Sequence, residues 1–143
     1  MKIDFKGVTA EELSFKLNRV RINPGDKLDI RPQFSRQVRK VTGNDKLNFI
    51  ALSIKIESTE AEPKPFDINA TIVGTFEVEL SNPNEERNFV IECTKLIYPY
   101  LRSAVTNLTA NAYIAPLNLP VISGPIFPED RDVYAFSVDS NLN

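Results

Sequence analysis

Residues 66–80 hold the longest run in the chain in which apolar and polar side chains alternate. Apolar residues or glycine occupy every even position from Phe66 to Leu80, whereas acidic, amide and hydroxyl side chains fill most odd positions. A period of two is typical of a β-strand with one buried and one wet face. We therefore predict a long strand that anchors the core, and Gly74 within it indicates a bulge or a close packing contact.

Three other segments have weaker strand patterns. Residues 47–57 alternate clearly and predict a half-buried antiparallel strand. Residues 14–22 are rich in β-formers, but their apolar side chains change parity, which a bulge near Asn18 would reconcile. Leu28, Ile30 and Phe34 suggest an extended segment that Pro32 interrupts, so an edge or irregular strand is expected there.

Asn82-Pro83-Asn84-Glu85 is a helix start, with Asn at the N-cap, Pro at the first helical position and Glu completing a capping box. Helical spacing of apolar residues continues to Pro99, which lacks an N–H and is expected to break or kink the helix. A second helix should then run to about Asn111. Its apolar stripe, which needs a partner surface, comprises Leu101, Val105 and Leu108.

The chain has 143 residues, which fits one domain, predicted here as residues 1–143. Four prolines follow Ile114 within a short span, so the end of the chain should be extended and meandering. Residues 122–143 are predicted to be an irregular tail.

Several absences limit the function. The net charge of −2 argues against nucleic acid as the main partner, and the absence of histidine removes the commonest general base and metal ligand. Five scattered glycines form no phosphate-binding loop. We expect no catalysis, no cofactor and no metal. Cys93, the single cysteine, should be a small buried apolar residue. Arg36, Arg39 and Lys40 should form a solvated basic cluster.

The cellular location is also predicted from what the sequence lacks. No apolar run approaches the roughly 20 residues that span a bilayer, so no direct membrane insertion is expected. Charged residues interrupt the N-terminus where a secretory signal would need an apolar region. We expect a cytoplasmic protein.

Four motifs, in order, resemble the SecB family of protein-export chaperones. Glu12-Leu13-Ser14-Phe15 is similar to the acidic-Ile-Ser-Phe of the family's first strand, and Lys27-Leu28-Asp29-Ile30 to its Val-Lys-Leu-Asp-Leu second strand. Ile97-Tyr98-Pro99-Tyr100-Leu101-Arg102 resembles the Leu-Phe-Pro-Tyr-Ala-Arg of the main helix. Pro116-Leu117-Asn118-Leu119-Pro120-Val121 resembles the following Leu-Asn-Leu-Ala-Pro-Val. The order of strands, long helix and extended apolar segment is the remaining match.

The resemblance implies an α+β fold, in which a four-stranded antiparallel sheet carries a main helix of the C-terminal half on one face. It also implies an ATP-independent holdase, a homotetramer built as a dimer of dimers, that binds unfolded or precursor polypeptides in apolar grooves. Matched residue by residue, the client-binding positions are Leu28, Ile30, Tyr98, Tyr100, Leu101, Tyr113, Leu117, Leu119 and Val121.

The resemblance is weaker for docking on the SecA motor, which the family achieves through acidic side chains on its sheet. Glu12 matches one such position, but Lys16 reverses the charge at a second and Asn69 is neutral at a third. The resemblance therefore supports client binding more strongly than coupling to SecA.

Other interpretations remain open at this level. Tyr98 and Tyr100 flank a proline, where aromatic residues are often core, and residues 117–121 could be a buried edge strand. A protein of this fold could also be dedicated to one partner, for example an antitoxin, without general chaperoning. The third alternative is an enzyme that uses Tyr, Lys or carboxylate groups in a cleft.

Overall fold

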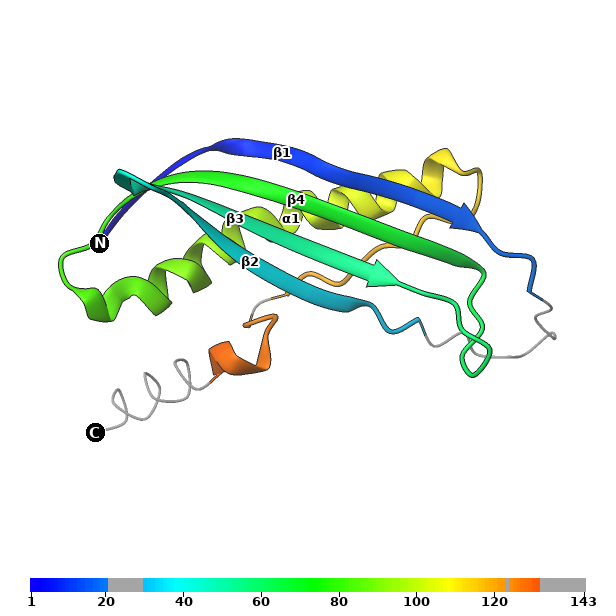
Figure 1. Ribbon diagram of the computed structural model, residues 1–143. Helices are drawn as coiled ribbons and strands as arrows, with labels where there is room; N and C mark the ends of the chain where they lie inside the picture. Colours follow the sequence, from blue (N-terminus) through cyan, green and yellow to red (C-terminus); the bar gives the residue numbers. More distant parts are fainter. Residues whose placement is uncertain (21–29, 123, 132–143) are drawn as a thin grey trace.

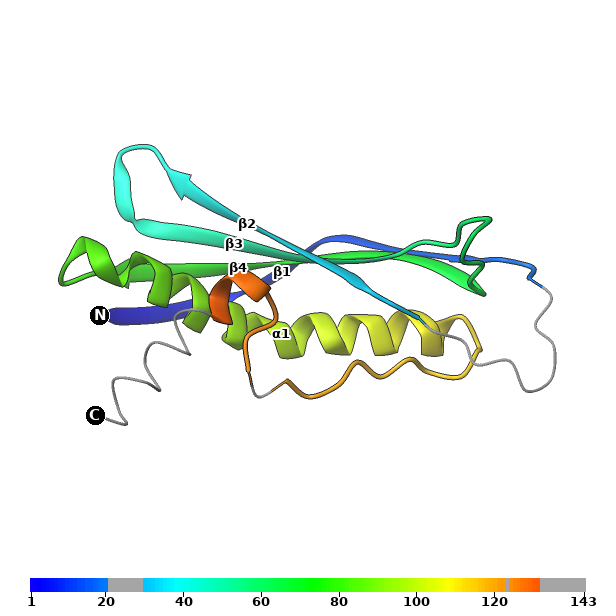
Figure 2. The same cartoon turned by 90° about the horizontal axis from the view of Figure 1, so that it is seen from below.

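The computed structural model describes residues 1–20, 30–122 and 124–131. In these ranges four antiparallel strands form one sheet, in the order β1-β4-β3-β2, and a long helix, α1, covers one face (Figures 1 and 2). The strands are β1 (Lys2–Leu17), β2 (Gln33–Val41), β3 (Asn44–Ile56) and β4 (Phe66–Glu79). A single 3₁₀ turn (Pro83–Glu85) precedes α1 (Glu86–Asn111). The expected α+β fold is confirmed.

Strand β4 lies inside the sheet, paired with β1 on one side and β3 on the other. The apolar side chains at the even-numbered positions of β4 face α1, as the alternation predicts. The apolar side chains at the even-numbered positions of β3 face α1 as well. None of the aliphatic and aromatic side chains on this face of β3 and β4 is more than 5% exposed. At roughly 1.5–3 kcal/mol for each large side chain, this layer supplies much of the driving force for folding.

Strand β1 is longer than predicted and begins near the N-terminus. The strand predicted over residues 14–22 is confirmed for residues 14–17 only, and the bulge near Asn18 is wrong, because β1 ends at Leu17; residues 21 and 22 lie outside the described residues. Two register shifts occur earlier, between Phe5 and Gly7 and between Ala10 and Glu12. Each shift returns the next apolar side chains to the face of the sheet that they would leave in a regular strand. Asn18 instead closes the end of the sheet, where its backbone N–H donates to the Pro65 carbonyl at 2.8 Å.

Strand β2 starts directly after Pro32 and pairs with β3 alone within the described residues. The expected edge strand is therefore present, but it begins later than the pattern suggested. A proline cannot donate to the ladder, which explains why pairing starts at Gln33. Leu28 lies outside the described residues.

Of the break or kink expected at Pro99, the break is wrong, since α1 is one helix with Pro99 inside it. Proline in a helix interior costs about 3 kcal/mol or more. The helix continues because Ile97, Leu101 and Val105, each 0% exposed, pack against the sheet on both sides of the proline. Figures 1 and 2 both show that α1 bends along its length rather than ending. No helix of the described ranges is long and apolar enough to span a membrane.

The start of the helix is as the sequence predicts, except that Glu85 binds a different backbone N–H. The Asn82 side chain accepts a hydrogen bond from the Asn84 N–H at 2.9 Å, as an N-cap does. Glu85 reaches back one residue further than a capping box, because its carboxylate accepts from the Ser81 N–H at 2.9 Å. These bonds satisfy N–H groups at the start of the 3₁₀ turn that leads into α1.

After α1 the chain reverses at Tyr113, which has a φ of 61°, and returns beside the helix as an extended segment (Figure 2). We name residues 114–122 the strap. Of the irregular tail predicted over residues 122–143, residues 128–131 are helical, and residues 123 and 132–143 lie outside the described residues. Pro128 suits the first position of a helix, where its missing N–H is not needed.

Candidate functional site

A row of side chains on α1 holds the backbone of the strap. The Tyr98 hydroxyl donates to the Pro120 carbonyl at 2.7 Å, and Arg102 Nε donates to the Leu119 carbonyl at 2.7 Å. Burial raises the pKa of the Tyr98 phenol, and the Arg102 charge opposes that effect. Tyr98 therefore stays protonated and available as a donor. The ring of Phe34, from β2, lies 6.3 Å from that of Tyr98.

Two threonines continue this row toward the end of the helix. Thr109 Oγ1 accepts the Leu117 N–H at 2.8 Å, and Thr106 Oγ1 lies 3.2 Å from the Leu117 carbonyl oxygen. Tyr98, Arg102, Thr106 and Thr109 are spaced by four, four and three residues, which places them on one helix face. Side chains of α1 thus bind backbone groups of Leu117, Leu119 and Pro120 in the strap. The sequence analysis did not identify Arg102, Thr106 and Thr109 as residues that bind the strap, although their helical spacing is visible in the sequence.

The anchored strap alternates between the core and solvent. Leu119 is 4% exposed and belongs to the hydrophobic core, whereas Val121 is 78% exposed. Between Val121 and α1 lies a pocket of about 100 Å³. Its walls are mainly apolar, and two basic residues join them; the lining residues are Lys95, Tyr98, Pro99, Arg102, Val121, Ile122, Gly124 and Ile126.

A second groove, of about 300 Å³, lies between α1 and the edge of the sheet formed by β1. Val8, Leu13, Tyr100 and Leu108 are among its lining residues. Tyr100 is 47% exposed, and its ring meets that of Phe5 edge to face at 6.0 Å. Residues two apart on a helix do not face the same way, so Tyr98 and Tyr100 belong to different surfaces.

The nine residues expected to bind a client therefore occupy three environments. Tyr98, Leu101 and Leu119 are buried in the chain itself; Ile30 and Leu117 are half-buried; Tyr100, Tyr113 and Val121 are exposed; Leu28 lies outside the described residues. Tyr98, Leu117, Leu119 and Val121 meet at the α1–strap surface. Tyr100 does not join them. The exposed members are those free to contact a partner without unfolding.

The outer face of the sheet carries the residues considered for motor docking. Glu12, Ser14 and Lys16 follow one another on the exposed face of β1, beside Asn69 and Asp67 of β4. Lys16 is in register with Asp67, whose carboxylate accepts from the Ser58 N–H at 2.8 Å. That bond, followed by one from the Asn18 side chain, lowers the pKa of Asp67. Glu12 therefore matches the acidic docking pattern of the family at one position, on a surface that also carries basic and neutral side chains.

The solvated basic cluster expected at Arg36, Arg39 and Lys40 is wrong for its first member. Arg39 forms two hydrogen bonds with the exposed carboxylate of Glu11, at 2.8 and 2.9 Å, and Lys40 pairs with Glu86 at the start of α1. Arg36 points to the helix side and has an 11% exposed side chain. Successive residues of a strand point to opposite faces, so a run of basic residues need not share one surface.

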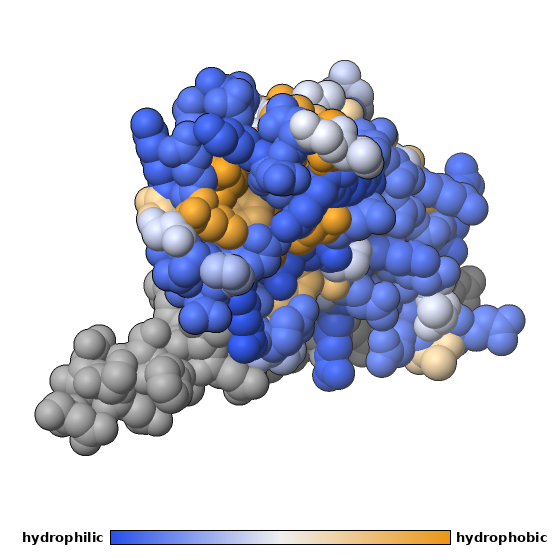
Figure 3. Space-filling view, turned by 60° about the vertical axis from the view of Figure 1, so that its left-hand side comes forward, coloured by the Kyte–Doolittle hydropathy of each residue, from blue (hydrophilic) through white to orange (hydrophobic). Residues whose placement is uncertain are grey.

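Cys93 is 0% exposed, and burial raises the pKa of its thiol to about 12. A thiol with so high a pKa is not a nucleophile at neutral pH. Among the described residues, no three His, Cys, Asp or Glu side chains are grouped as metal ligands. Figure 3 shows a mostly hydrophilic surface over the end of the molecule that carries the β2–β3 hairpin, with apolar side chains in recesses.

Comparison with known proteins identifies relatives of this chain. An uncharacterized protein of Methanocaldococcus jannaschii is 27% identical over 125 residues, 85% of this chain and 79% of that protein. The protein-export protein SecB of a Jannaschia species is 29% identical over 128 residues, 85% of this chain and 74% of that protein. A SecB-like chaperone of Mycobacterium tuberculosis, in complex with a peptide from an antitoxin, has a similar structure, with a TM-score of 0.71 at 17% identity over 87% of this chain and 93% of that chain.

The fold and the SecB-named relatives point to the class of SecB-like chaperones and client-binding proteins. Residues 8–124 match the family model described as Preprotein translocase subunit SecB. This match covers more than half of the chain. The chain belongs to the SecB family.

Proposed function

We propose that this protein is a holdase that binds unfolded polypeptides, without ATP, on the apolar surface between α1 and the strap. The observation that carries the proposal is the apolar pocket beside Val121, whose side chain is largely exposed although Leu119, two residues earlier, is buried in the core. Contact between apolar groups is non-directional and suits clients of many sequences. Among the described residues β2 pairs only with β3, so its other edge would add backbone hydrogen bonds that ignore client sequence.

Assembly and cellular setting extend the proposal. In an assembly of four copies, the second groove would provide contact surface, since it leaves Leu13 50% and Tyr100 47% exposed. The cytoplasm, where export precursors are made, is the compartment in which such a holdase would act. Docking on SecA rests on Glu12 alone and has the least support. Size-exclusion chromatography with light scattering should give a tetramer mass; a monomer at micromolar concentration would contradict the assembly.

A second candidate is a protein dedicated to one partner. The M. tuberculosis chaperone of similar fold holds a peptide from an antitoxin, which shows that this fold can carry one specific peptide. Pull-down from the native source separates the two functions. One stoichiometric partner, with no binding of a reduced and carboxymethylated model protein, would favour the dedicated role.

Replacing Val121 with aspartate should weaken binding of such an unfolded model protein by roughly tenfold, measured by fluorescence anisotropy. The reason is that a carboxylate beside the pocket would have to be desolvated when an apolar client segment binds, and a tenfold loss corresponds to about 1.4 kcal/mol. Ala61→Asp is the matched control, because it adds the same charge at an exposed position between β3 and β4, outside the strap and the edge of β2. Equal effects of the two substitutions would contradict binding at the strap.

Replacing Tyr113 with glycine should raise stability while it lowers client affinity. Its positive φ costs a non-glycine residue roughly 1–2 kcal/mol, and the 98% exposed ring contributes little packing in return. Because glycine loses more chain entropy on folding, we expect a net gain below about 1 kcal/mol in urea denaturation, with a severalfold loss of client affinity. Tyr113→Asn, which also tolerates this conformation, is the control. A variant of unchanged affinity would remove Tyr113 from the client surface.

A further inference from the structure

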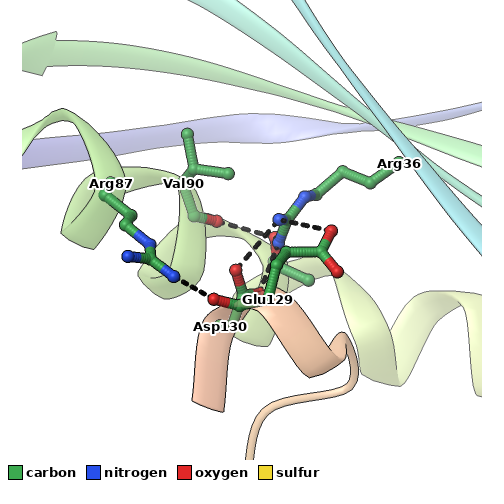
Figure 4. A network of polar contacts seen from close by, with 6 residues as sticks. Arg36, Arg87, Val90, Glu129 and Asp130 are labelled. Carbon is green, nitrogen blue, oxygen red and sulfur yellow. Dashed lines mark hydrogen bonds and ion pairs between the residues drawn. The ribbon is translucent and has the colours of Figure 1, made fainter. Parts of the chain in front are cut away.

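Arg36 is a buried cation on an otherwise apolar face. It lies in β2 opposite Leu52 of β3, which is 0% exposed, and points toward α1. A guanidinium in such surroundings is costly unless its donors are paired. Two donors of Arg36 are paired with Asp130, at 2.7 and 3.1 Å (Figure 4). The Asp130 side chain is only 4% exposed, so this is a buried, two-bonded ion pair.

The rest of the sheet and helix adds specific contacts to this pair. Thr94 of α1 accepts a hydrogen bond from Arg36 at 3.1 Å and donates its own to the Val90 carbonyl at 2.6 Å. The guanidinium also lies over the ring of Phe127, 4.4 Å from its centroid. Together, Arg36 and Thr94 hold a carboxylate and an aromatic ring at a fixed spacing.

Arg87, near the start of α1, completes the site. It donates to the backbone carbonyl of Glu129, and the Glu129 carboxylate lies 3.8 Å from Arg36 (Figure 4). Arg36 thus pairs with both carboxylates, those of Glu129 and Asp130, and Arg87 brings a second cation to the Glu129 carbonyl. Without residues 127–130 the site would carry an uncompensated positive charge beside apolar surface, which favours an acidic ligand.

Residues 127–130 fill this site as a ligand would. They are not part of the sheet, and they contact β2 and α1 mainly through the Phe127 ring and the groups of Glu129 and Asp130. We propose that the Arg36 site is a recognition site for polypeptide segments with an aromatic residue three positions before an aspartate. In the free chain its own Phe127-Pro128-Glu129-Asp130 occupies the site in cis, and a partner segment of the same pattern displaces it.

The test uses the full chain and a labelled peptide of residues 124–131, Gly-Pro-Ile-Phe-Pro-Glu-Asp-Arg. Phe127→Ala/Asp130→Ala vacates the site in the full chain. By fluorescence anisotropy, this variant should bind the peptide at least tenfold more tightly than the unaltered chain does. A peptide with asparagine at the Asp130 position, or addition of Arg36→Met to the variant, should weaken binding at least tenfold. Failure of the folded variant to bind, or binding that ignores both changes, would overturn the proposal.

A second measurement covers the outcome in which the double variant does not fold. In Asp130→Asn, amide hydrogen exchange over residues 126–131 should be at least tenfold faster than in the unaltered chain, while exchange in β4 stays the same. Global destabilisation in both variants would show that residues 127–130 belong to the core and would overturn the proposal. The result is independent of the holdase activity, since a chain that ignores unfolded model proteins can still bind this peptide.

Discussion

Leu101→Ala should lower the free energy of unfolding by about 2–5 kcal/mol, measured by urea denaturation at a fixed protein concentration. Leu101 is 0% exposed and lies one helical turn from Ile97 and from Val105, both also 0% exposed. Truncation would leave a cavity between α1 and the sheet that rigid β-strands cannot close. The expected loss is therefore a property of the single chain and needs no client.

This result would distinguish core from client surface among the residues that the family resemblance singles out. Val121→Ala is the matched control, because Val121 is 78% exposed and its truncation should change stability by less than about 0.5 kcal/mol. If Leu101→Ala were neutral in stability but lost client binding, Leu101 would belong to the client surface and the packing described here would be wrong.

The sequence predicts those strands whose periodicity is uninterrupted. Alternation in β4 is a local property, so its bounds and its buried face could be read directly. In β1 the apolar residues Ile3, Phe5, Val8 and Ala10 are spaced by two, three and two, because a bulge lies between the second and third. A bulge is chosen by the pairing with β4, and this pairing is not visible in the sequence of β1 alone. The first half of the strand was missed for that reason.

The helix break expected at Pro99 is absent, because packing against the sheet outweighs the local preference of proline. The missing N–H and the ring of proline both oppose a helix at this position. Ile97 and Leu101, on the two sides of it, bury completely only if the same helix continues across the sheet. Tertiary burial therefore outweighed the local cost. The apolar stripe that includes Leu101 and Val105 was predicted correctly, because it depends on spacing alone.

The candidate site could be located from the sequence but not resolved into its parts. The motifs at residues 97–102 and 116–121 were expected to act together, and hydrogen bonds from α1 to the strap do join them. Which side chains face the core depends on the rotation of α1 against the sheet, and this separates Tyr98 from Tyr100. Arg36 was misread because Asp130 lies 94 residues further along the chain.

Gly74→Ala should destabilise the protein by about 1–3 kcal/mol, because the site has no room for a methyl group. A Cβ on Gly74 would lie 2.5 Å from Ile97 Cγ2 and 2.7 Å from Phe76 Cε2, far inside contact distance. Both side chains are 0% exposed and cannot move without displacing their neighbours. The glycine thus lets α1 approach β4 at the level of Ile97, which directly precedes Tyr98, the first of the α1 residues that anchor the strap.

Gly124→Ala provides the matched control, since nothing lies within 4 Å of a Cβ there. The same change in chain entropy should leave stability unaltered or raise it by less than about 1 kcal/mol. If Gly74→Ala behaves like Gly124→Ala, then α1 is not packed tightly on β4. In that case the bonds from Tyr98 and Arg102 to the strap would not be fixed relative to the sheet, and the pocket beside Val121 would lose its rigid wall.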